Sequence, residues 1–281
     1  MPELPEVETV RRGLAPAWEG RRIIRVETRR ADLRFPFPAN FNQRLTGARL
    51  THMGRRAKYL VGELSTGEAL VMHLGMTGRF TVWDKKIGTY VHATAGDPKH
   101  DHVVFELEGG TRVTFNDPRR FGSMDLWPAG ELDVYPAFDG MGPEPLSNQF
   151  SGAALREAFR GKKTPVKSAL LDQRVVAGLG NIYVVEALFR AGVNPEKLAG
   201  AISGPRVEKL AVAIRQVIGE AIEAGGSSIS DFAAADGSPG YFQHRFQVYD
   251  REGEPCVTCA KPVKRIVQAG RSSFYCGRCQ K

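Results

Sequence analysis

Apolar residues follow two different patterns along this chain. Between residues 21 and 127, β-branched and aromatic residues form short runs separated by turn-forming residues, which is the pattern of β-strands. The runs cover residues 23–26, 59–64, 69–73, 103–107, 113–115 and 124–127. The sequence Glu-Gly-Gly-Thr at 108–111 is typical of a hairpin, and most gaps are too short for crossover helices. We therefore expect an antiparallel β-sandwich or flattened barrel here.

Helical spacing marks the start of the chain and its second half. Pro5 is expected to begin a leading helix, with Arg11 and Arg12 near its end. Its apolar face consists of Val7, Val10 and Leu14. Further helices are expected at residues 153–159, 166–171, 181–191 and 205–224. Asn181 is expected to cap the third of these, and two glycines follow the last.

Proline and glycine mark the boundaries between these regions. The stretch 129–149 contains several of both and predicts an irregular connection, and 226–240 is rich in Gly, Ser and Ala and predicts a loop. A chain of 281 residues is long enough for more than one compact core. We expect a multidomain α+β protein with a β-sandwich domain at 1–138, a linker at 139–151, a helical domain at 152–245 and a small domain at 246–281.

The charge distribution favours a polyanionic partner. The formal net charge is +8, and almost all of it lies after residue 150. A basic surface suits nucleic acid, because neutralising phosphates releases counterions, and we rank nucleic acid above an anionic membrane. Gly178 and Gly180 before a helix could present amides to a phosphate, although an ordinary tight turn has the same pattern. No stretch is apolar enough to cross a membrane and the N-terminus is acidic, so we expect a cytosolic protein.

All four cysteines lie in the last 26 residues, in two Cys-x2-Cys pairs. They are Cys256, Cys259, Cys276 and Cys279. This spacing is typical of a tetrahedral zinc site, and two disulfides are the poorer interpretation in a cytosolic protein. Four protein ligands leave no open position on the metal, so we expect one structural Zn²⁺ and no catalytic metal.

The first residues carry candidate covalent chemistry. Removal of Met1 would leave the secondary amine of Pro2 beside the carboxylate of Glu3. An α-amino group titrates near pH ~8, so part of it is an unprotonated nucleophile at neutral pH. Addition of this amine to an aldehyde-like carbon gives an iminium, which is an electron sink. A Met-Pro start without chemical purpose remains the alternative.

Motifs along the whole chain resemble formamidopyrimidine-DNA glycosylases, in the order found in that family. The motifs lie at residues 1–9 (MPELPEVET), 56–60 (RAKYL), 73–78 (HLGMTG), 99–102 (KHDH), 117–122 (DPRRFG), 180–183 (GNIY) and 239–242 (PGYF), and in the four-cysteine tail. The resemblance implies an N-terminal β-sandwich with a leading helix, a helix-two-turn-helix domain and a C-terminal zinc-finger hairpin.

The resemblance also implies the reaction. The family excises oxidised purines, chiefly 8-oxoguanine and formamidopyrimidines, from duplex DNA and cleaves the abasic site by β,δ-elimination. Pro2 would be the nucleophile and Glu3 the acid, with Lys58 in a proton-transfer role and Arg271 assisting the second elimination. From the residue alone, Lys58 could equally be a phosphate-binding lysine on a sheet face. A monomer in the bacterial cytoplasm, associated with the nucleoid through DNA, is expected.

DNA contacts are implied for further residues. His100, Arg119, Lys162 and Asn181 match positions that hold DNA, although Lys163 could take the place of Lys162. Met76, Arg119 and Phe121 match side chains that fill the void left by a flipped nucleotide. The loop 226–241 resembles the segment that closes over the flipped base.

Three other functions remain open at this point. An endonuclease VIII-like glycosylase for oxidised pyrimidines typically carries Gly where this chain has Leu4. A noncatalytic zinc-ribbon DNA-binding protein has no need of the Pro2-Glu3 start, and a tautomerase that uses a terminal proline has no need of the basic second half. Duplex binding without cleavage of an abasic site would favour the DNA-binding protein.

Overall fold

The computed structural model describes residues 2–83, 96–228, 235 and 239–281, and its internal contacts divide the chain into two units. Unit 1 consists of residues 1–139 and 224–241, and unit 2 of residues 140–223 and 242–281. The segment 224–241, which the sequence-based boundaries place in the helical domain, thus groups with the β-rich unit. Those boundaries stay a prediction.

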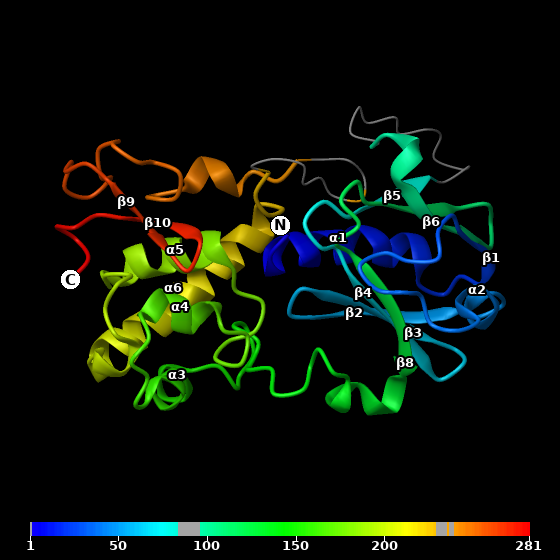
Figure 1. Cartoon of the computed structure of the whole chain (residues 1–281), viewed down its shortest axis with the longest axis horizontal. Coiled ribbons are helices and arrows are strands. Elements are labelled where there is room, and N and C mark those ends of the chain that lie inside the picture. Colours follow the sequence, from blue (N-terminus) through cyan, green and yellow to red (C-terminus); the bar gives the residue numbers. More distant parts are fainter. Residues whose placement is uncertain (1, 84–95, 229–234, 236–238) are drawn as a thin grey trace. The chain divides into compact units, whose positions relative to one another are not determined.

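Unit 1 contains two four-stranded antiparallel sheets (Figure 1). One sheet has the order β1 (Ile23–Thr28), β6 (Asp101–Leu107), β7 (Arg112–Asn116) and β5 (Arg79–Trp83). The other has the order β2 (Leu50–Arg56), β3 (Tyr59–Leu64), β4 (Glu68–His73) and β8 (Ser123–Pro128). The sandwich and the β6–β7 hairpin are as predicted, whereas β2, β5 and the short helix α2 (Phe41–Leu45) were not predicted.

The leading helix α1 (Leu4–Trp18) is longer than the sequence suggested. It continues past Arg12 and includes Pro16 in its last turn, although proline is unfavourable inside a helix. The reason lies in the core, because the extra turn brings Trp18 between the two sheets, where it is fully buried. Its ring lies 4.7 Å from that of Phe105.

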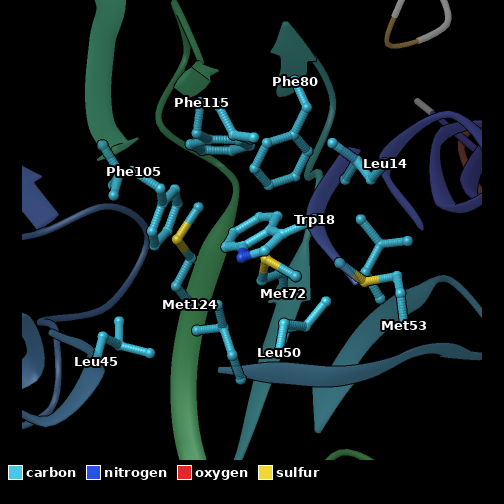
Figure 2. Packing of buried hydrophobic residues seen from close by; sticks show 14 of the residues in the cluster. Leu14, Trp18, Leu45, Leu50, Met53, Met72, Phe80, Phe105, Phe115 and Met124 are labelled. Atoms are coloured by element: carbon cyan, nitrogen blue, oxygen red, sulfur yellow. The ribbon is translucent and has the colours of Figure 1, made fainter. Parts of the chain in front are cut away.

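Figure 2 shows this core around Trp18. One sheet contributes Phe80, Phe105 and Phe115, and the other contributes Leu50, Met53, Met72 and Met124. Aromatic rings on one side and flexible thioethers on the other fill the space around the indole. The buried end of α1 thereby fixes the direction of the helix whose other end carries Pro2 and Glu3.

Unit 2 is mainly helical. Its helices are α3 (Gly152–Phe159), α4 (Val166–Leu171), α5 (Asn181–Ala191) and α6 (Gly204–Glu223). Each was predicted to within one residue, but the cap of α5 was wrong. Gly180 is the N-cap, with extended backbone angles, and Asn181 is the first helical residue. The Asn181 side chain is engaged elsewhere, as described below.

The C-terminal segment forms a two-stranded antiparallel hairpin of β9 (Lys264–Gln268) and β10 (Arg271–Tyr275). Phe274 and the buried cysteines pack against Val185 and Phe189 of α5. Glu186 of α5 is fully buried and accepts the backbone N–H groups of residues 247–249. The hairpin is therefore tied to the helices by both a core and buried hydrogen bonds. Within the described residues, no helix has the length and apolar character that a membrane span requires.

Candidate active site and nucleic-acid interface

Pro2 and Glu3 lie directly before α1, and both are buried. Glu3 is the N-cap of the helix, and its side chain accepts the backbone N–H of Glu6. The Glu6 carboxylate in turn accepts the backbone N–H of Glu3 at 2.9 Å. These reciprocal bonds form a capping box, which fixes the backbone beside Pro2. Met1 lies outside the described residues.

Glu6 also holds the base of the segment expected to close over a flipped base. Its second carboxylate oxygen accepts the backbone N–H of Ser227 at 2.7 Å. Ser227 pairs with Tyr241, so the two ends of the segment lie together. The same carboxylate therefore joins the start of α1 to this segment. Most of the predicted lesion loop, residues 229–234 and 236–238, lies outside the described residues.

Lys58 occupies the two-residue turn between β2 and β3 and not a sheet face, which the alternative interpretation required; its predicted role in proton transfer stays a prediction. The turn is tight, because Ala57 adopts a left-handed conformation with φ of 50°. Helix α1 packs against both flanking strands, and a 3.2 Å ion pair joins Glu8 to Arg55 of β2. Lys58 itself is 9% exposed. The β2–β3 turn therefore holds this amine at a buried position on strands that α1 covers.

Glu8 attaches α1 to the sheet that contains β2 and β3. Burial alone would raise its pKa, but hydrogen bonds and charges from Arg11, Arg12 and Arg55 lower the pKa below the usual glutamate value. Arg11 also donates to the Met53 carbonyl oxygen of β2 at 3.2 Å. Glu8 is therefore a structural carboxylate, and Glu3 remains the candidate acid.

His73, at the end of β4, is bonded to the loop that follows this strand. Burial, and then the positive charges of Lys58 and Arg34, lower the pKa of His73 to about 4. The ring is therefore neutral at pH 7, and its Nδ1 accepts the backbone N–H of Gly75 at 2.9 Å. Its ring also packs against that of Tyr59, with 4.7 Å between the centroids and the planes tilted by 52°. These contacts fix the loop that carries Met76.

The three predicted void-filling side chains lie on two adjoining loops. Met76 is 39% exposed and Phe121 is 42% exposed, so both side chains are accessible to a partner. The Arg119 guanidinium lies 4.7 Å from the centre of the Phe121 ring. Gly75 packs so closely on the second loop that a Cβ there would clash with the backbone of Phe121. The structure thus brings Met76, Arg119 and Phe121 together.

His100 belongs to the same region of unit 1, because its carbonyl oxygen accepts the backbone N–H of Asp117 at 3.0 Å. Asp117 begins the loop that carries Arg119 and Phe121. The roles in DNA binding that we assign to His100 and to the loop residues stay predictions. All of these residues lie on neighbouring turns, as a shared DNA-binding surface requires.

In unit 2, Asn181 and Arg271 lie close together. The Asn181 side-chain amide donates to the Ser272 carbonyl oxygen at 3.0 Å, directly beside Arg271. Arg271 itself is exposed. Lys162 follows the end of α3, and no contact joins it to Asn181 or Arg271 among the interactions described for this unit. The choice between Lys162 and the more exposed Lys163 stays open.

Lys167 is a residue of this region that the motifs did not single out. It is fully buried, and its Nζ donates to the Ser272 carbonyl oxygen at 2.9 Å and to the Ser273 hydroxyl at 2.6 Å. Burial, and then the charge of Arg271, lower the pKa of Lys167 to about 8. One feature of the sequence could have indicated this buried lysine. Lys167 lies on the apolar face of a short predicted helix, where a solvated charge is not expected.

The cysteine thiols have the geometry of a zinc site. The four Sγ atoms all lie within 4.8 Å of one another, with 3.9 Å between Cys256 and Cys279 and 3.5 Å between Cys259 and Cys276. A tetrahedral ion with Zn–S bonds of ~2.3 Å needs sulfur atoms about 3.8 Å apart. The donor set therefore fits one structural Zn²⁺ closed by four thiolates.

Comparison with known proteins identifies the class to which this protein belongs. Family models for the formamidopyrimidine-DNA glycosylase N-terminal domain and H2TH domain match residues 1–124 and 141–233. A model for the zinc finger found in FPG and IleRS matches residues 253–281. The fold is therefore that of a DNA glycosylase with a zinc finger.

Full-length relatives narrow the class to one family. The formamidopyrimidine-DNA glycosylases of Ruegeria pomeroyi and Phenylobacterium zucineum are 59% and 57% identical, over 100% of both chains in each case. The solved MutM (Fpg) protein of Thermus thermophilus is 40% identical with a TM-score of 0.87, covering 99% of this chain and 98% of that one. The chain belongs to the formamidopyrimidine-DNA glycosylase family.

Two further solved structures contain DNA. Lactococcus lactis Fpg was solved with DNA containing an abasic site, and its G226P mutant with DNA containing Fapy-dG. Each is 34% identical to this chain, with a TM-score of 0.88 and complete coverage of both chains. Their DNA identifies lesions that members of this family bind.

Proposed function

We propose that this chain is a bifunctional DNA glycosylase and lyase that excises oxidised purines from duplex DNA and cleaves the backbone at the resulting abasic site. The observation that carries the proposal is the position of Pro2 and Glu3 before α1. Both residues are buried, and the capping box with Glu6 fixes their backbone. The DNA-bound relatives support the same substrate class.

The reaction begins once Met1 is removed. The Pro2 nitrogen forms a bond to C1′ of the damaged nucleotide while the glycosidic bond breaks, and the departing base takes up a proton. Glu3 is the acid placed for this transfer, since it adjoins the nucleophile. Opening of the sugar ring gives an iminium that keeps its positive charge without a proton.

Strand cleavage follows from the same intermediate. The iminium acidifies the C2′ hydrogens, so loss of a C2′ proton drives expulsion of the 3′ phosphate. A second elimination expels the 5′ phosphate, and water then releases the Pro2 amine. Lys58, held in the β2–β3 turn, is the group for proton transfer in these steps.

Binding requires that the nucleotide leave the duplex, at a cost of a few kcal/mol. Met76, Arg119 and Phe121 fill the void, and the Arg119 guanidinium can also hydrogen-bond the orphaned base. His100, Lys162, Asn181 and Arg271 contact the backbone, and Zn²⁺ stabilises the hairpin that carries Arg271. We place the enzyme in the bacterial cytoplasm as a monomer, associated with nucleoid DNA.

Borohydride trapping tests the proposal. Purified protein is incubated with a duplex that contains one 8-oxoguanine opposite cytosine, reduced, digested and mapped by mass spectrometry. A covalent adduct on Pro2 supports the nucleophile, the substrate class and the lyase reaction together. An adduct with an oxidised pyrimidine alone would assign the protein to the endonuclease VIII side. Tight binding without any adduct would contradict the catalytic proposal.

A further inference from the structure

We propose that Asp117 and Thr77 are positioning residues that hold Met76, Arg119 and Phe121 as one rigid unit for insertion into the duplex. The inference rests on the proposed function, because it concerns how the void behind a flipped nucleotide is filled. It adds two residues to which the proposed function assigns no role.

The central observation is a buried carboxylate between two loops. Asp117 is fully buried. Its Oδ1 accepts the Thr77 hydroxyl at 2.6 Å, and its Oδ2 accepts the backbone N–H of Gly122 at 2.8 Å. Thr77 belongs to the loop after β4, whereas Gly122 ends the loop before β8. One side chain therefore ties together two loops that lie 40 residues apart in sequence.

The Thr77 hydroxyl extends this connection to Arg119. While donating its hydrogen to Asp117, the same oxygen accepts the backbone N–H of Arg119 at 3.2 Å. Each void-filling residue therefore either makes one of these hydrogen bonds or directly precedes a residue that does. Met76 precedes Thr77, Arg119 supplies the bonded amide, and Phe121 precedes Gly122.

Other contacts hold Asp117 itself. Its N–H donates to the His100 carbonyl oxygen at 3.0 Å, and its carbonyl oxygen accepts from Nε2 of His102 at 2.9 Å. The close approach of Gly75 to the Phe121 backbone completes the packing between the loops. Asp117 is therefore bonded to His102 of β6 and to His100 just before this strand, and a rotation of one loop would break hydrogen bonds in both loops.

The physical benefit is preorganisation. Side chains on two independently moving loops would have to be ordered when they enter the stack, and that ordering would oppose flipping. Loops joined by a buried, hydrogen-bonded carboxylate are already ordered. The cluster lowers the cost of filling the void and leaves the chemistry at Pro2 unaltered.

The test compares Thr77→Val with Thr77→Ser. Valine keeps the shape but removes both bonds of the hydroxyl, whereas serine retains the hydroxyl. Two single-turnover rates are measured: excision of 8-oxoguanine opposite cytosine in a duplex, and strand cleavage at an abasic site in a single strand, which has no stack to fill. A 2-aminopurine beside the lesion reports insertion into the duplex.

We expect Thr77→Val to slow duplex excision about tenfold or more, because the buried Asp117 carboxylate loses a hydrogen-bond donor. The 2-aminopurine signal should slow by the same factor. Cleavage of the single strand should match wild type, and Thr77→Ser should restore duplex excision.

Two results would overturn the inference in a protein that excises 8-oxoguanine. One is a wild-type duplex rate for Thr77→Val, and the other is an equal loss on both substrates, which would indicate general damage to the active site. Failure of the wild-type protein to excise the lesion would instead overturn the proposed function, and this inference with it.

Discussion

Proline offers a free secondary amine only at the start of a chain, and this property makes Pro2 the most consequential single residue. Pro2→Gly would supply a primary amine, whose iminium can lose its proton and with it the positive charge. We expect strand cleavage of an 8-oxoguanine duplex to fall by about tenfold or more. Pro5→Ala, which leaves the terminal amine unchanged, is the control, and a near-normal rate for Pro2→Gly would exclude the nucleophile assignment.

His73 gives a prediction about pH. Its pKa is about 4 in the folded protein, because of burial and the charges of Lys58 and Arg34, against about 6.5 when unfolded. Between these values the unfolded chain binds more protons, so the stability that His73 contributes is present above pH 6.5 and is lost as the pH falls toward 4.

The measurement is the free energy of unfolding of wild type and His73→Asn at pH 7 and pH 5. Asparagine keeps an acceptor for the Gly75 amide but does not titrate. Wild type should lose about 2 kcal/mol relative to the variant between these pH values. A constant difference between the two proteins would show that His73 does not titrate with this shift.

At this scale, the sequence predicted residues whose chemistry depends on position or spacing alone. Pro2 follows from its place in the chain, and the zinc ligands follow from the Cys-x2-Cys pairs. No role was predicted for Asp117, Thr77 or Lys167, although the first two lie inside the family motifs, because their importance lies in contacts with residues far away in sequence. The role of a buried polar group depends on the group it is bonded to. A local sequence pattern does not reveal a partner that lies far away in the chain.

At the scale of elements, the errors concern the strands β2 and β5 and the end of helix α1. The two strands that were not predicted, β2 and β5, both lie at the edge of a sheet. An edge strand needs fewer buried side chains, and β2 buries only Leu50 and Met53. Helix α1 was underestimated for the opposite reason, because burial of Trp18 outweighs the unfavourable Pro16. Only for α1 did tertiary packing override the local signal; for β2 the local signal was weak because few of its side chains are buried.

The joint between helix α4 and strand β10 gives a prediction of its own. Lys167→Met should leave the Ser272 carbonyl with Asn181 as its remaining side-chain donor and loosen the hairpin beside Arg271. We expect hydrogen exchange in residues 264–275 to accelerate about tenfold, with DNA affinity falling in parallel. Lys209→Met, at an exposed position of α6, is the matched control, and unchanged exchange in Lys167→Met would argue against this role.

At the scale of the whole molecule, the two units have separate hydrophobic cores. The core around Trp18 contains no cysteine, whereas the cluster of α5 with the hairpin includes Cys256 and Cys276. We therefore expect loss of zinc to destabilise unit 2 and to leave the core of unit 1 folded. Because almost all of the net positive charge lies after residue 150, unit 2 also carries most of the expected attraction to DNA.

Zinc removal tests this division. A strong chelator should unfold the hairpin, since four thiolates without an ion cannot hold residues 256–279 in place. Duplex binding should then be abolished, while the near-ultraviolet circular dichroism of Trp18 and its aromatic neighbours persists. Added Zn²⁺ should restore binding, and Cys256→Ser should reproduce the loss without chelator. Unchanged affinity after verified loss of zinc would mean that unit 1 and the helices suffice for DNA binding, and that Arg271 is dispensable for it.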